Sequence, residues 1–466
     1  MKNSPLFQVF ARLDKKEKRE LKKWVRSPAF NQRQDVVQLY EHLLKISSPD
    51  DKRLRKEYIF QKLYPGLPFE DEKIRVCQFY LFKLLKSYLV FQEAQRDESR
   101  RQIHLCEAYN RKGLGELYEK EWHKTLHRLQ QQPQRHAEYH HQHFQLRKEY
   151  IGRTLREKRS DDIDIDTAMQ ALKSYYLSET LRLSCSMRSQ QHLTRKEYDL
   201  QGIQEVLEMI EQGDHLSHPS IAIYYHGYQL LSETENSDHF ATFRQTLAAH
   251  WQQFPPGECR GLYLLAINYC IRQLNRGQRQ FIRQAFQLYR NALQNKVLLE
   301  DGFISKFAYN NILTLAIALS EWVWAADFLE QYKAYLPPDE RQNIYEYNLA
   351  IYYFRKPDYE KAQQLLRRVE FKDRLYNLNG RSMLARIYFE LDEFDALASL
   401  LDSFHVYLRR QEQLSYHRDN YLNFILFLRK MLRSNLSDSS TRQELQRELG
   451  DISAIAEKKW LLEQLK

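Results

Sequence analysis

The chain has 466 residues, with 13 glycines, 12 prolines and 43% hydrophobic residues. So few turn residues exclude a strand-rich fold and predict an all-α chain that is helical almost throughout. No apolar run approaches the roughly 18 to 20 residues that a membrane helix requires, and the first residues contain no apolar stretch long enough for a signal peptide. We therefore expect a soluble, cytoplasmic protein without a membrane partner.

The net charge of +10 is unevenly distributed along the chain. Residues 1–160 carry 35 Lys and Arg against 21 Asp and Glu, whereas the remaining residues carry 36 against 40. Attraction to an acidic partner is therefore expected in the first third of the chain.

The five cysteines are scattered and form no CxxC pair, which indicates small buried thiols in a reducing compartment rather than disulfides or metal ligands.

Residues 1–95 are predicted to form a basic helical N-terminal domain. A charged helix near 14–26 ends before Pro28, because the residue that precedes a proline is pushed out of the helical region. A second helix, from about 70 to 94, is apolar over much of its circumference. That pattern predicts burial of this helix on several sides.

The charged helix near 14–26 is also the candidate for contacts with nucleic acid. Its basic side chains can neutralise phosphates, and Trp24 and Phe30 are near enough in sequence to stack on bases. However, Glu17 and Glu20 interrupt the basic run, and Leu21 fits an ordinary charged helix that packs on a core. The candidate contacts are Lys15, Lys16, Lys18, Arg19, Lys22, Lys23 and Arg26.

Residues 96–160 are predicted to form basic, irregular helical hairpins. They contain His123 with His127 and His136 with His140, each pair at the i, i+4 spacing of histidines that share a metal. The glutamate of an HExxH motif is absent, and the surrounding Gln, Arg and Lys residues indicate a solvated face. We predict no metal site and no other cofactor, while the spacing leaves a metal at this histidine set open.

An acidic turn, SDDIDID at 160–166, separates the basic part from the rest of the chain. Asp162, Asp164 and Asp166 resemble the start of a calcium loop, but Thr167 replaces the required glycine and Lys173 replaces the final glutamate. We expect these carboxylates to cap the following helix instead, because negative charge is favourable at a helix N-terminus.

A repeat is the strongest pattern in the sequence. LAIYYFRKPDYEKAQQLL at 349–366 returns 35 residues later as LARIYFELDEFDALASLL at 384–401. Each copy is predicted to be a helix, a tight turn and a second helix, and Ala350 and Ala362 allow the two axes to approach closely. Weaker hairpins are predicted upstream, the first of them over 218–253.

This unit resembles the tetratricopeptide repeat, a helical hairpin of about 34 residues with small and aromatic residues at set positions. The resemblance is best over 343–410 and extends, with units of unequal length, over 161–410. It implies a right-handed α-solenoid of tetratricopeptide-like hairpins, with the N-terminal helical region as one cap and C-terminal capping helices over 411–466. The segment RSPAFN and the helices after it also resemble helical-repeat proteins of Bacteroidetes bacteria, from which no activity is carried over.

No phosphate-binding glycine loop, dinucleotide motif or nucleophile elbow occurs, so we do not expect an enzyme. The resemblance implies a concave surface, lined by the first helices of the hairpins, that binds a protein or peptide partner. We predict a non-enzymatic adaptor or scaffold; a nucleic-acid-binding protein that uses the basic first third and a regulator that responds to a small ligand remain alternatives. The predicted partner-binding residues are Leu313, Ile317, Glu321, Tyr347, Ile351, Arg355, Ser382, Arg386 and Glu390.

Overall fold

The computed structural model of the chain describes residues 2–157, 163–232, 238–369, 374–410 and 415–466, except Ser47, Pro49 and Arg195. The described residues form α-helices joined by turns and short 3-10 helices, and the one pairing of strand type is an isolated bridge between Glu300 and Phe303. The prediction of an all-α fold is thus confirmed. Within these ranges, no helix combines the length and the apolar character needed to cross a bilayer.

The chain divides into two compact units, Met1–Thr180 (unit 1) and Leu181–Lys466 (unit 2). The division falls inside one long helix, α9 (Ile165–Thr194). The finer boundaries at 95, 160 and 410, which rest on composition and repeats, stay predictions.

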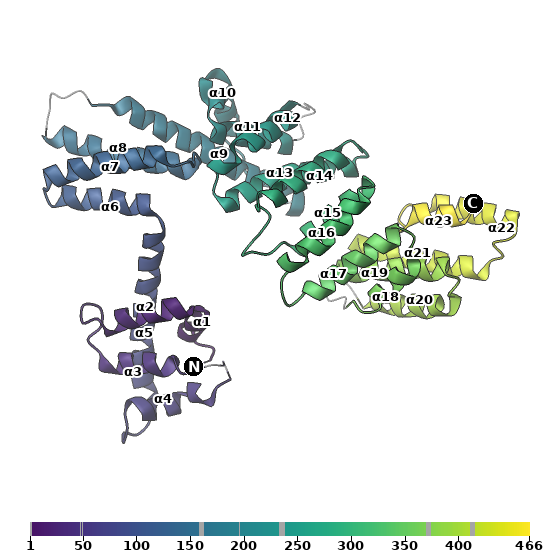
Figure 1. Cartoon of the computed structure of the whole chain (residues 1–466), viewed down its shortest axis with the longest axis horizontal. Helices are drawn as coiled ribbons and strands as arrows, with labels where there is room; N and C mark the ends of the chain where they lie inside the picture. Colours follow the sequence, from purple (N-terminus) through teal and green to yellow (C-terminus); the bar gives the residue numbers. More distant parts are fainter. Residues whose placement is uncertain are drawn as a thin grey trace. The chain divides into compact units, whose positions relative to one another are not determined.

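The first helices of unit 1 pack around one long helix, α5 (Figure 1). Their buried side chains form one core that includes Leu21, Val36, Phe60 and Leu85. The bounds are α1 (Pro5–Arg12), α2 (Lys15–Arg26), α3 (Gln34–Leu43), a 3-10 turn (Lys52–Leu54), α4 (Lys56–Leu63) and α5 (Asp71–Arg96).

The helix over 70–94 is predicted to be buried on several sides, but the structure leaves one of its faces exposed. One face of α5 is buried, with Ile74, Cys77 and Leu81 in the core. Phe79 and Val90 are exposed on another face. Helical periodicity shows that a segment is apolar, but the number of neighbouring helices decides how many of its faces are covered.

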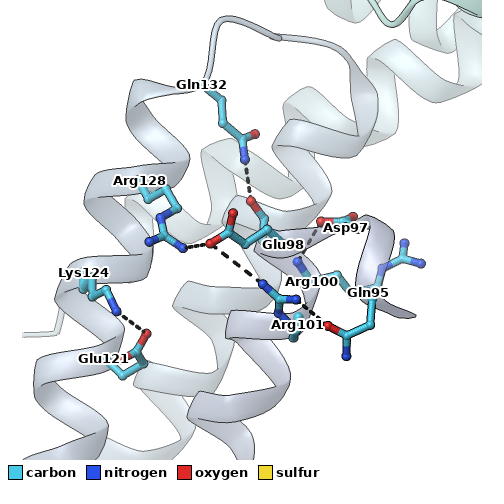
Figure 2. Close-up of polar contacts among 10 residues, drawn as sticks. Gln95, Asp97, Glu98, Arg100, Arg101, Glu121, Lys124, Arg128 and Gln132 are labelled. Carbon is cyan, nitrogen blue, oxygen red and sulfur yellow. Dashed lines mark hydrogen bonds and ion pairs between the residues drawn. The ribbon is translucent and has the colours of Figure 1, made fainter. Parts of the chain in front are cut away.

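After α5, unit 1 continues with three helices that pack together, α6 (Glu98–Arg111), α7 (Gly115–Gln131) and α8 (Ala137–Glu157). It ends within α9. Trp122 lies in their small core and donates its indole N–H to the Leu146 carbonyl at 3.0 Å. Polar side chains link α6 to α7 at one end: Glu98 pairs with Arg128 and lies 3.9 Å from Arg101 (Figure 2). Several basic side chains of this region are therefore neutralised within the chain.

Unit 2 continues as paired helices. Adjacent helices pack on each other as hairpins, α11 on α12, α13 on α14, α17 on α18 and α19 on α20. The first helices of successive hairpins also contact, as α15 with α17 and α17 with α19. The bounds are α10 (Ile203–Gln212), α11 (Pro219–Leu231), α12 (Asp238–His250), α13 (Pro256–Asn275), α14 (Phe281–Gln294), α15 (Lys306–Ala318), α16 (Trp322–Tyr332), α17 (Arg341–Arg355), α18 (Tyr359–Leu366), α19 (Arg374–Glu390) and α20 (Phe394–Arg409), with 3-10 turns at Asp214–Ser217, Trp251–Gln253 and Lys333–Tyr335.

Small residues lie where the hairpin helices approach each other. Ala350, Ala362 and Ala385 are fully buried, in agreement with the close approach predicted from the repeat. The chain ends with α21 (Ser415–Arg433), α22 (Ser439–Asp451) and α23 (Lys458–Gln464), and Trp460 of α23 is buried in the same core. The five cysteines are buried and free, as expected.

Candidate functional site: a groove in unit 2

A groove of about 590 Å³ lies along the first helices of three successive hairpins in unit 2. The helices α15, α17 and α19 bring these side chains together because α17 packs against both of the others. Its lining mixes apolar side chains, amides and two arginines. The lining residues are Asn310, Thr314, Ile317, Ala318, Tyr347, Ile351, Phe354, Arg355, Asn379, Met383, Arg386 and Glu457.

Part of the predicted partner-binding set lines this groove. The structure brings together Ile317 from α15, Tyr347, Ile351 and Arg355 from α17, and Arg386 from α19. The residues on α17 are spaced by four, so they follow one another along one helical face. A contact surface on the first helices of the hairpins is thus physically available at Ile317, Ile351, Arg355 and Arg386, which are at least partly exposed.

Other members of the predicted set lie elsewhere. Leu313, Tyr347 and Ser382 are each at most 2% exposed, so none of them presents its side chain to a partner, although Tyr347 borders the groove. Glu321 is the exposed N-cap residue of α16, outside the groove lining. Spacing places residues on one helical face, whereas burial depends on how the next hairpin is rotated against it.

The chain's own C-terminus engages the α19 side of the groove. Glu457, which precedes α23, pairs with Arg386 at 2.7 Å and accepts a hydrogen bond from the Ser382 hydroxyl at 3.3 Å. Glu390 lies on α19, as Arg386 does. It accepts hydrogen bonds from the Trp460 indole at 2.7 Å and from another side-chain amide of α23. Three residues of α19 that are predicted to contact a partner, Ser382, Arg386 and Glu390, thus already bind side chains of the same chain.

Arg386 is held by aromatic rings as well as by charge. Its guanidinium carbon lies 4.6 Å from the centre of the Phe354 ring and 5.2 Å from that of Trp460. Stacking of this kind suits arginine, whose planar group is weakly hydrated.

Tyr421 lies near the same ion pair. Burial and the charge of Glu457 raise the pKa of Tyr421 to about 12, so its hydroxyl stays protonated and donates to Asn379 at 2.8 Å.

Arg355 differs from Arg386 in its surroundings. It is exposed at the C-terminal end of α17, and within the described parts of the chain it forms no ion pair. Asn310 at the other side of the groove donates to the Asn348 side chain at 3.1 Å. The groove therefore offers a guanidinium that lies 5.9 Å from the centre of the Phe354 ring and has no ion pair among the described residues, beside the apolar side chains of Ile317 and Ile351.

Sequence reasoning missed several lining residues. Asn310 and Thr314 lie three to four residues from predicted positions on α15, so a wider helical face would have included them. Asn379 and Met383 have the same relation to the predicted positions on α19. Glu457 lies more than 70 residues from Arg386 in sequence, and no local pattern signals that contact.

The basic residues predicted to contact nucleic acid lie on α2 in unit 1. Asp14 and Glu17 form a capping box at its start, and Leu21 and Val25 are buried. Lys15, Arg19, Lys22 and Arg26 recur at i, i+4, i+7 and i+11, which places them on one face. Arg26 pairs with Glu41, and the ammonium of Lys18 lies 5.1 Å from the centre of the Phe10 ring.

The predicted aromatic stacking partners of that helix stack on each other. The rings of Trp24 and Phe30 are 4.0 Å apart and nearly parallel, and Phe91 lies 5.0 Å from Trp24. Trp24 is therefore partly covered, whereas Phe30 keeps an exposed face. Lys16 and Lys23 are exposed on α2 as well.

The histidine set does not converge on a metal site. His123 and His127 are exposed on α7, while His136 is half-buried, and burial lowers its pKa. Among the residues that the structure describes, no group of three or more His, Cys, Asp or Glu side chains is placed to hold a metal ion.

Asp164 caps α9 by accepting from the Thr167 amide at 3.0 Å, as expected, whereas Asp162 lies outside the described residues.

In comparisons with known proteins, no family model, no curated protein and no solved structure matches this chain. The groove and the basic face of α2 are therefore interpreted from their own geometry and chemistry.

Proposed function

We propose that unit 2 is a right-handed α-solenoid of tetratricopeptide-like hairpins and that the protein is a non-enzymatic cytoplasmic adaptor or scaffold. Its groove holds a protein or peptide segment. The N-terminal helices of unit 1 provide a cap or a second contact surface. Stacked hairpins expose their first helices along one surface, which suits an extended or helical segment.

The observation that carries this proposal is the composition of the groove. Ile317 and Ile351 supply apolar contacts, while Arg355 and the amide of Asn310 supply polar ones. Binding sites combine an apolar lining with a few polar groups that fix the orientation of the ligand.

A photo-crosslinking residue at Ile351 tests the groove directly in the native cell. We expect a defined crosslinked protein from position 351 and none from Gln364, an exposed residue of α18 outside the groove lining. The same product should be lost when Ile317 is replaced by Asp, because a buried charge on the contact surface costs several kcal/mol. Equal crosslinking from both positions, with helical circular dichroism unchanged, would contradict the proposal.

A second candidate function is binding of single-stranded nucleic acid by α2. The observation that favours it is the alignment of Lys15, Arg19 and Lys22 on one helical face, beside the face that buries Leu21 and Val25. Exposed Phe30 lies at the end of the same segment. A row of cations on one helical face suits a phosphate backbone.

Salt dependence tests this second candidate. Replacing Lys15, Arg19, Lys22 and Lys23 together with Gln should weaken binding to a single-stranded oligonucleotide, and the slope of log K against log salt should fall by about 3. Four exposed lysines elsewhere in unit 1, Lys52, Lys62, Lys112 and Lys120, provide the matched Gln control. Binding that is insensitive to salt, or an equal loss in the control, rules out α2 as the site.

A further inference from the structure

An apolar stripe on α5 in unit 1 is exposed over much of its length. Val76, Phe79, Tyr80 and Val90 recur at helical spacing with Lys83, so they share one face. Phe79 is 62% exposed and Val90 is 70% exposed. From Val76 to Val90 the face extends about 21 Å, at 1.5 Å per residue.

The opposite face of α5 explains why the stripe is open. The helices α1 to α4 all pack on α5 (Figure 1). The side chains of α5 buried in the resulting core include Ile74, Cys77, Leu84 and Tyr88. The sequence of α5 is therefore apolar on more faces than the unit covers. Contiguous exposed apolar side chains on a folded domain indicate a contact surface for another molecule.

The charges around the stripe are positive. Lys83 lies within it, and the ammonium of Lys86 lies 5.0 Å from the centre of the neighbouring Phe82 ring. The guanidinium of Arg33 lies 4.7 Å from the centre of the Tyr80 ring, but its charge is balanced by an ion pair with Asp35 at 2.6 Å. Glu72, one turn before Val76, and Glu93, three residues after Val90 and paired with Arg96, are acidic residues at the two ends of this face. The middle of the stripe thus combines apolar contact with positive charge.

This charge pattern argues against a second copy of the chain as the occupant. Two copies of α5 that pair in antiparallel fashion about the centre of the stripe bring Lys83 against its own counterpart. Like charges placed opposite each other destabilise such a pair. Glu72 at the end of the same face opposes insertion of that end into an anionic bilayer.

We propose that the Val76–Val90 face of α5 docks one amphipathic helix of a partner protein, with apolar residues at i, i+3, i+4 and i+7 and acidic residues beside them. The apolar residues of the partner cover Phe79 and Val90, and its carboxylates pair with Lys83 and Lys86. This inference concerns unit 1 and does not rest on the groove of unit 2.

Two designed peptides of about 18 residues test the proposal with the full chain. Both carry Leu at i, i+3, i+4 and i+7; one carries Glu at the remaining positions and the other Lys. We expect the Glu peptide to bind at least about tenfold more tightly than the Lys peptide in a fluorescence anisotropy titration. The double variant Phe79→Ser, Val90→Ser should lose at least about tenfold in affinity for the Glu peptide.

Charge reversal makes the test specific. Lys83→Glu together with Lys86→Glu should invert the preference, so that the Lys peptide binds more tightly. The control Leu155→Ser, at a residue of α8 that is 57% exposed, should leave binding unchanged. Because all the changed side chains are at least partly exposed, the helical circular dichroism should be retained in every variant.

Three results overturn the proposal. Equal affinity for the Glu and Lys peptides would show that charge complementarity does not contribute to binding, although the proposal requires it. Self-association in analytical ultracentrifugation that disappears in the Phe79→Ser, Val90→Ser variant assigns the stripe to a second copy. Flotation with phosphatidylserine vesicles that is lost in the same variant assigns it to a membrane surface.

Discussion

Replacing Phe404 with Ala is expected to lower the free energy of unfolding of unit 2 by about 3 to 5 kcal/mol. Phe404 of α20 is fully buried, and its ring lies 5.8 Å from that of Tyr421 on α21. Removal of the ring loses its transfer free energy and leaves a cavity between two helices that pack on each other. Urea denaturation followed by circular dichroism measures the change.

Val406→Ala provides the matched control for this prediction. Val406 lies two residues further along α20 and is exposed, so its truncation should change the free energy of unfolding by less than about 0.5 kcal/mol. A loss at Phe404 no larger than that at Val406 would show that α20 does not pack on α21 through this ring.

The second large effect is expected at Glu457. Glu457→Ala should destabilise the C-terminal part of unit 2 by about 2 kcal/mol, because it leaves the guanidinium of Arg386 buried without its carboxylate. The side chain of Glu457 is about one-third exposed, so water screens part of the interaction and the effect stays below that of a fully buried pair. Faster hydrogen exchange in α23 measures the local loss.

Two variants separate the ion pair from general damage to the C-terminus. Glu463→Ala breaks the exposed pair between Glu463 and Lys459 on α23 and should cost less than about 0.5 kcal/mol. Adding Arg386→Met to Glu457→Ala removes the unpaired charge and should recover part of the stability. Equal effects of Glu457→Ala and Glu463→Ala would contradict a specific role for the Arg386 pair.

Local sequence information was sufficient for the helices and their hairpins. The repeat at 349–401 predicted small residues at close helix approaches, and Ala350, Ala362 and Ala385 are buried there. Apolar periodicity and turn residues act within a few residues of each other, so one sequence reveals them. The same holds for the capping of α9 by Asp164.

The candidate site was predictable only in part. The spacing on α17 placed Tyr347, Ile351 and Arg355 at the groove, where the structure also has them. Leu313 shares a comparable spacing but is buried, because the adjacent hairpins cover that face of α15. Periodicity identifies a face of a helix, whereas the rotation of neighbouring hairpins decides which faces remain open.

The sequence by itself therefore determined an all-α chain of helical hairpins, a basic first third and buried free cysteines. Only the tertiary structure decided that Glu457 reaches Arg386 and that the Phe79 face of α5 stays open. The physical reason is range: helix formation depends on residues a few positions apart, whereas a contact across some 70 residues depends on the path of every intervening helix. An uncovered face, likewise, is a property of the neighbours that a helix has in space.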